Sequence, residues 1–219
     1  MRTGILGRIA RGTRHGYDKD SIREPLASAF YDVRHTVSRD LHAVERNRIL
    51  TGRALGYEPK GAPDFGLDRA RYRKAGAPYA VLLHATAQPQ KEWPVEKWIA
   101  LGREMTGEGI EVVLPYGTPA ERARSERIAS SVPGARVPER APLDHVAALI
   151  GGAHSVVGVD TGLLHLAAAL GVPLIAVFAG SKPHLTKPVG SGPMIVLGEH
   201  GAAPGLEEVI AAWRLTGRS

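Results

Sequence analysis

Short apolar runs alternate with segments of helical periodicity between residues 78 and 215. The run 79–84 follows a proline and is apolar throughout, which is typical of a buried strand. In the segment 94–105, Val95, Trp98 and Met105 recur at helical spacing. The pattern predicts strands at 79–84, 110–114, 155–159, 174–178 and 194–197, and helices at 94–105, 118–130, 142–150, 162–170 and 206–213. Repeated strand–helix units with buried strands predict an α/β fold with a parallel sheet covered on both faces.

Residues 1–60 lack this alternation. They are rich in Arg and His, and only the segment 40–55 shows a helical pattern. Proline and glycine then interrupt the chain repeatedly, at Pro59, Gly61, Pro63, Gly66, Gly76 and Pro78. We therefore predict a first domain over 1–60, a linker over 61–78 and a second domain over 79–219.

The composition narrows the class of protein. With 43% hydrophobic and 23% charged residues the chain is typical of a globular protein, and the lack of cysteine excludes disulfides and thiolate chemistry. The longest apolar stretch, 155–179, contains Asp160 and His165, so we predict no membrane span there. The arginine-containing N-terminus lacks the apolar segment and the cleavage site of a signal peptide.

Positive charge is concentrated at the N-terminus. Residues 1–60 hold 12 of the 28 basic side chains but only 7 of the 22 acidic ones. Such an excess indicates either a solvated surface or an acidic partner such as a phosphate, an acidic sugar or an anionic lipid. Nucleic acid is disfavoured as a partner, since aromatic residues make up only 5% and no nucleic-acid-binding motif is present.

The segment from Val156 to Pro173 carries the most informative motif. An apolar strand stops at Asp160, Thr161 and Gly162 follow at once, and a helical segment begins there. This layout places backbone N–H groups and the positive end of a helix against an anion, so it predicts a phosphate site. His165 lies on the same side of the first helical turn as Thr161. Two other interpretations stay open, a helix-capping role for Asp160 and a buried structural role for His165.

Two further polar clusters follow strands. Thr86 and Lys91 come after the strand 79–84 and offer a hydroxyl and an ammonium to a diphosphate, or form a solvated loop. Glu121 lies in the first turn of the helix 118–130, where it either complements the helix dipole or binds ribose hydroxyls. Because ligands of parallel sheets bind beyond the carboxyl ends of the strands, these clusters and the Asp160 motif are expected at one edge of the sheet.

A fourth cluster lies in the basic N-terminal segment. It comprises Arg23, His42 and Arg46, of which the last two share a helix face. Taken with the other clusters, these residues form motifs that run in order through nearly the whole chain. The motifs are REPLAS (23–28), HAVER (42–46), LGY (55–57), HAT with K-x-W-P (84–94), LPYG (114–117) and VDTGLLHL (159–166). In this combination the chain closely resembles the heptosyltransferases of lipopolysaccharide inner-core synthesis, and among them the type I enzymes.

The resemblance implies a GT-B fold, with a Rossmann-like parallel-sheet C-terminal domain and a remnant of the N-terminal Rossmann-like domain. It implies inverting transfer of L-glycero-D-manno-heptose from ADP-heptose to the Kdo of Kdo2-lipid A, with no metal and no cofactor. The implied site divides into three sets. Donor-binding residues are Thr86, Lys91, Glu121, Asp160, Thr161, Gly162 and His165; acceptor-binding residues are Arg23, His42 and Arg46; Lys91 and Asp160 also support catalysis.

The resemblance also implies where the chain departs from the family. Ala87 replaces a hydroxyl residue that often follows the HAT threonine. Family members carry further sequence before the position matching Met1, including the Asp assigned as general base, and loss of such a base costs about 100- to 10,000-fold in rate. We therefore expect ADP-heptose binding with impaired turnover, at the cytoplasmic face of the inner membrane. The alternatives are a type II heptosyltransferase, a non-catalytic nucleotide-sugar-binding module and, least favoured, an NAD-dependent oxidoreductase.

Overall fold

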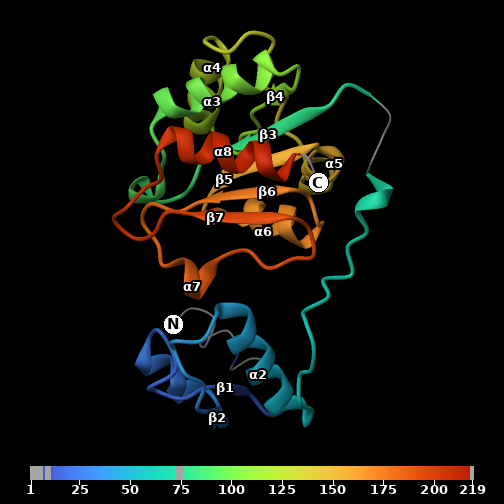
Figure 1. Cartoon of the computed structure of the whole chain (residues 1–219). Coiled ribbons are helices and arrows are strands. Elements are labelled where there is room, and N and C mark those ends of the chain that lie inside the picture. The colour runs from blue at the N-terminus through green and yellow to red at the C-terminus, as the bar shows by residue number, and fades with distance from the viewer. Residues whose placement is uncertain (1–6, 8–10, 73–75, 218–219) are drawn as a thin grey trace. The chain divides into compact units, whose positions relative to one another are not determined.

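The computed structural model describes residues 7, 11–72 and 76–217 in two compact units, drawn in Figure 1. One unit comprises Met1–Ala62 with His184–Thr186, and the other comprises Pro63–Pro183 with Lys187–Ser219. Within the described ranges, no helix is both long enough and apolar enough to cross a membrane.

The second unit is built on a five-stranded parallel sheet. Its strands stand in the order β4 (Glu111–Val113), β3 (Tyr79–Leu83), β5 (Ser155–Val159), β6 (Leu174–Val177) and β7 (Met194–Leu197), as Figure 1 shows. All residues of β5 and β6 are buried, which explains why their sequences are continuously apolar. All five strands were predicted from the pattern, with ends shifted by one residue or not at all.

Helices cover both faces of this sheet, as predicted. Alternate strand residues point to opposite faces, so Leu82 and Val157 belong to one buried cluster and Val81 and Val156 to the other. The first cluster is completed by α3 (Val95–Gly107), α4 (Pro119–Ala129) and α8 (Leu206–Thr216). The second is completed by α5 (Leu143–Gly152) and α6 (Gly162–Ala169), while the short helix α7 (Pro183–Thr186) was not predicted.

One helix end differs from the prediction. The pair Gly151-Gly152 was expected to stop the helix 142–150, but α5 includes both glycines. A Cβ atom on Gly151 would lie 2.7 Å from the Tyr72 ring, so this glycine provides room for close packing. In the same region Arg69 donates hydrogen bonds to the carbonyls of Gly151, Ala153 and Gly171. The stretch Arg69–Tyr72, within the predicted linker, therefore belongs to the second unit.

The first unit contains a two-stranded parallel pair, β1 (His15–Tyr17) and β2 (Val33–His35), and the helix α2 (Ala43–Leu55). The helix was predicted over 40–55 and begins three residues later. His42 is its N-cap and accepts a hydrogen bond from the backbone of Val44, and Gly56 ends it in the left-handed conformation. The two strands were not predicted, because three partly polar residues each give no readable alternation.

Candidate functional site

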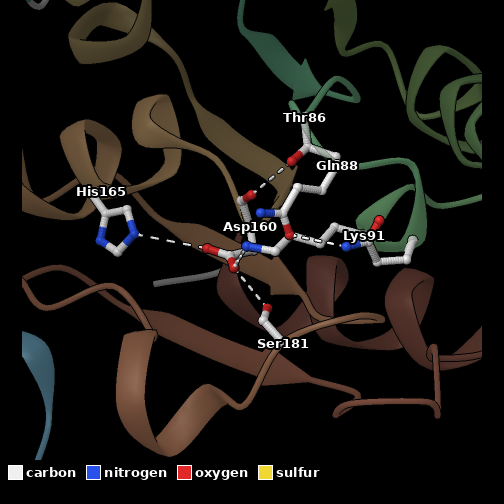
Figure 2. A network of polar contacts seen from close by, with 7 residues as sticks. Thr86, Gln88, Lys91, Asp160, His165 and Ser181 are labelled. Atoms are coloured by element: carbon white, nitrogen blue, oxygen red, sulfur yellow. Dashed lines mark hydrogen bonds and ion pairs between the residues drawn. The ribbon is translucent and has the colours of Figure 1, made fainter. Parts of the chain in front are cut away.

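Side chains from three strand ends meet at one edge of the second unit's sheet. Thr86 and Lys91 follow β3, Asp160 follows β5, and Ser181 follows β6, and Figure 2 shows them directed toward one another. Parallel strands bring their carboxyl ends to the same edge, which is why residues so far apart in sequence converge.

Asp160 is the centre of this polar network. Its Oδ2 atom accepts a hydrogen bond from Lys91 Nζ at 2.8 Å and another from Ser181 Oγ at 2.7 Å. Its Oδ1 atom lies 4.0 Å from His165 Nε2, and its backbone carbonyl accepts from Thr86 Oγ1 at 3.2 Å. The Lys91 and Asp160 side chains are 20% and 9% exposed, so the ion pair is largely shielded from water.

The beginning of α6 supplies a second source of positive potential next to this network. Thr161 is the N-cap and makes no side-chain capping hydrogen bond, and the first turn of α6 contains no acidic residue. A Cβ atom placed on Gly162 would meet nothing within 4 Å. The N-terminus of α6 therefore has open space beside Gly162, where an anion fits.

This geometry decides two of the open alternatives. The N-cap of α6 is Thr161, and the carboxylate of Asp160 is engaged by Lys91 and Ser181, so a simple capping role for Asp160 is excluded. The side chain of His165 is 43% exposed, which excludes a buried structural histidine.

Glu121 lies in the first turn of α4, as predicted, and makes a capping interaction there. Its Oε2 atom accepts from the backbone N–H of Gly117 at 2.7 Å and of Thr118 at 3.2 Å, while Thr118 Oγ1 accepts from the Glu121 N–H at 3.2 Å. This reciprocal pair is a capping box at the start of α4. Glu121 and Thr86 nevertheless line one pocket of about 490 Å³, so two of the seven predicted donor-binding residues share a cavity.

Polar contacts with α4 hold the residues on either side of the loop that carries Thr86 and Lys91. His84 is fully buried, and its Nε2 atom lies 2.8 Å from Ser125 Oγ on α4. Burial, together with the charge of Arg124, lowers the pKa of His84 to about 4, so this histidine is neutral at physiological pH. Arg124 in turn donates to Glu92 Oε2 and to the Trp93 carbonyl, both at 2.7 Å.

The predicted acceptor residues lie in the first unit. Arg23 is exposed, and His42 caps α2. The Arg46 guanidinium donates to the carbonyl of Ser21 and lies 4.8 Å from the centre of the Tyr17 ring. His42 and Arg46 thus have local structural roles in addition to any role in binding.

Sequence reasoning missed Ser181. The run 174–178 was predicted as a strand, and the rule that ligands bind beyond strand ends applies to the Gly180-Ser181 pair as much as to Asp160. A single serine in a loop gave no further signal, and only its distance to Asp160 identifies it. In the described part of the chain, no group of three or more His, Asp or Glu side chains is arranged to hold a metal ion.

Known proteins are similar to this chain in sequence and in fold. Glycosyltransferase family 9 (heptosyltransferase) matches residues 2–212. Lipopolysaccharide heptosyltransferase 1 of Pseudomonas aeruginosa is 42% identical over 196 residues, which cover 88% of this chain and 55% of that protein. The chain spans 55 to 61% of the length of the curated type 1 enzymes that it matches.

Solved structures agree. The Escherichia coli heptosyltransferase WaaC with ADP superposes with a TM-score of 0.85 at 34% identity, covering 98% of this chain and 69% of that one. The same enzyme with ADP-2-deoxy-2-fluoro heptose gives a TM-score of 0.79 at 35% identity, covering 100% and 69%. These matches confirm the GT-B type fold. The chain belongs to glycosyltransferase family 9, the heptosyltransferases.

Proposed function

We propose that this chain binds ADP-heptose at the sheet edge formed by Thr86, Lys91, Asp160 and the start of α6. The observation that carries the proposal is that Asp160 holds the Lys91 ammonium next to the N-cap of α6, a helix whose first turn has no acidic residue and whose Gly162 borders open space. An ammonium and a helix N-terminus together suit a diphosphate better than a neutral ligand. The solved relative carries ADP in its structure, which supports the same ligand here.

The donor lies, in this proposal, with its diphosphate at α6 and its ribose toward Glu121. Thr86 connects the two ends, because it lines a pocket with Glu121 and its Oγ1 atom donates to the Asp160 carbonyl, and this supports the proposed direction. Glu121 Oε2 already binds two backbone N–H groups, and a carboxylate with two oxygens has further lone pairs for ribose hydroxyls. His165 and Thr161 complete the lining from α6.

The reaction is transfer of L-glycero-D-manno-heptose to the Kdo of Kdo2-lipid A, with inversion at the anomeric carbon. The acceptor hydroxyl gives its proton to a general base, which is not among the site residues assigned above, and its oxygen bonds to that carbon as the bond to the ADP oxygen breaks. Negative charge develops on the leaving diphosphate. Lys91 and the N–H groups of α6 stabilise that charge, and they hold their positions before the reaction because Asp160 fixes the ammonium. These groups replace a divalent cation in the proposal, so the activity is expected to resist EDTA.

Arg23, His42 and Arg46 are proposed to face the acidic acceptor. The basic excess of residues 1–60 supports this assignment, since Kdo and lipid A phosphates are anionic. The same charge supports peripheral attachment to the cytoplasmic face of the inner membrane.

Calorimetric titration with ADP tests the donor site. Gly162→Ala adds one methyl group where the structure has open space, so the fold is retained and the approach of a phosphate is blocked. Gly107→Ala at the end of α3 is the matched control, because its Cβ atom would also meet nothing within 4 Å. We expect the control to bind like the unaltered chain, and Gly162→Ala and Lys91→Ala to bind at least about tenfold more weakly, since each loses one charge-assisted contact.

NADH serves as the competing ligand. Unchanged ADP affinity in both site variants, or tighter binding of NADH than of ADP, contradicts the proposal. Transfer of heptose to Kdo2-lipid A, followed by mass spectrometry of the product, then tests the acceptor.

A further inference from the structure

Ser181 lies on the loop that follows β6, and its hydroxyl reaches the centre of the donor site. Its Oγ atom donates to Asp160 Oδ2 at 2.7 Å, the same oxygen that accepts from Lys91 Nζ at 2.8 Å, as Figure 2 shows. Asp160 is 9% exposed, so the hydroxyl contacts a carboxylate that water hardly reaches. A hydrogen bond to a shielded charge is stronger than one between neutral groups.

The backbone on either side holds Ser181 in place. Phe178 is fully buried and its N–H donates to the Leu197 carbonyl at 2.8 Å. The carbonyl of Ala179 accepts from the Gly201 N–H at 2.8 Å. A Cβ atom on Gly180 would lie 2.5 Å from the Gln90 carbonyl oxygen, so only glycine lets this loop approach the loop that carries Lys91. The serine hydroxyl is therefore positioned before any ligand arrives.

We infer that Ser181 is a positioning residue of the donor site, acting through Asp160 on Lys91. This role of Ser181 rests on the proposed binding of ADP-heptose. With Ser181 and Lys91 both on Oδ2, the carboxylate plane is fixed and Oδ1 stays toward His165. Without the hydroxyl the carboxylate is free to rotate about its Cβ–Cγ bond, and the Lys91 ammonium follows it away from the first turn of α6.

The test compares Ser181→Ala with Ser181→Thr, which keeps the hydroxyl, and with Ser130→Ala. Ser130 is a matched control because it also loses one hydroxyl hydrogen bond, to the Arg127 carbonyl, at the far end of α4 from Glu121. Affinities for ADP and for adenosine are measured by calorimetry. We expect Ser181→Ala to weaken ADP about tenfold, as for loss of one hydrogen bond to a charged group, and to leave adenosine unchanged. Ser181→Thr and Ser130→Ala are expected to bind both ligands like the unaltered chain.

A double variant separates positioning from loss of structure. If Ser181 acts through Lys91, then Ser181→Ala has no further effect on ADP affinity once Lys91 is Ala. Equal loss of ADP and adenosine affinity in Ser181→Ala, full additivity with Lys91→Ala, or no effect on ADP each overturns the inference.

Crystal structures of the unaltered chain and of Ser181→Ala test the role of Ser181 independently of ADP binding. If the unaltered chain does not bind ADP, the donor assignment fails, and the structure of Ser181→Ala decides about Ser181 alone. A Lys91 ammonium displaced from the first turn of α6 supports the positioning role, and an ammonium and an Asp160 carboxylate that both keep their places beside α6 overturn it.

Discussion

The ion pair between Lys91 and Asp160 is expected to contribute a measurable coupling free energy to folding. At 2.8 Å between Nζ and Oδ2, and with an effective dielectric constant of about 20, the attraction of two unit charges is about 6 kcal/mol. Desolvation of both ions offsets most of this, because the side chains are only 20% and 9% exposed. We expect a net coupling of about 2 kcal/mol, above the range of about 0.2 to 1 kcal/mol typical of exposed pairs.

A double-mutant cycle measures this coupling. Lys91→Met keeps the hydrophobic part of the side chain, and Asp160→Asn keeps an oxygen for Ser181. Each single variant is expected to lose about 2 to 3 kcal/mol of unfolding free energy in urea, because it leaves the other partner without its counter-charge. The double variant should lose about 2 kcal/mol less than the sum of the two.

Tryptophan fluorescence reports the unfolding of the relevant unit. All three tryptophans of the chain, Trp93, Trp98 and Trp213, are buried in the second unit. The matched control is the pair Arg127 and Glu96, which is 3.0 Å apart but 65% and 72% exposed, and whose cycle should give a coupling near zero. A Lys91–Asp160 coupling below about 0.5 kcal/mol, no larger than that of an exposed pair, would refute the reasoning.

Three further predictions concern the structure around the site. Because burial and Arg124 lower the pKa of His84 from 6.5 to about 4, the unfolded chain binds the proton first as the pH falls. The free energy of unfolding is therefore highest above pH 6.5 and declines toward pH 4, with about 2 kcal/mol lost between pH 7.5 and pH 5. Urea titration at several pH values should show this decline in the unaltered chain and a smaller one in His84→Gln. An equal decline in both would contradict the prediction. Glu121→Ala should lose about 1 kcal/mol through the capping box, whereas Glu121→Gln keeps an acceptor oxygen and loses less; thermal denaturation decides, and equal losses would argue against capping. In Gly158→Ala the new Cβ atom would lie 2.8 Å from Leu164 Cδ1 and 2.9 Å from Leu83 Cβ, so overpacking should cost about 1 to 3 kcal/mol; a melting temperature equal to that of Gly107→Ala would disprove this.

Much of the second unit could be predicted because its strands are buried on both faces and its helices are amphipathic. The run from Val156 to Val159 is apolar throughout and ends at a charged residue, so both the strand and its end are visible in the sequence. Clustering of Thr86, Lys91 and Asp160 followed from the rule that parallel strands end at one edge. Glu121 was predicted in the first turn of its helix, where the structure places it, but its part in a capping box was not predicted.

Other features depend on contacts between distant residues. The glycine pair Gly151-Gly152 is typical of a helix end, but α5 includes both glycines, and Gly151 packs closely against Tyr72. Ser181 carries no motif, and its role appears only when the loops after β3 and β6 are brought together at Gly180. The strands β1 and β2 are three residues long, too short for any periodicity.

Arg69 has a consequence for how this fold can be divided and recombined. Arg69 precedes β3, the first strand of the sheet along the chain. Its guanidinium donates to the carbonyls of Gly151 at the end of α5, of Ala153 just beyond it, and of Gly171 after α6. A recombination event that joined a new partner domain directly at Tyr79 would leave these three carbonyls without their donor. The exchangeable module therefore extends upstream of its first strand and includes Arg69. The inherited unit is defined by hydrogen bonding, and a division based on proline and glycine content would cut through it.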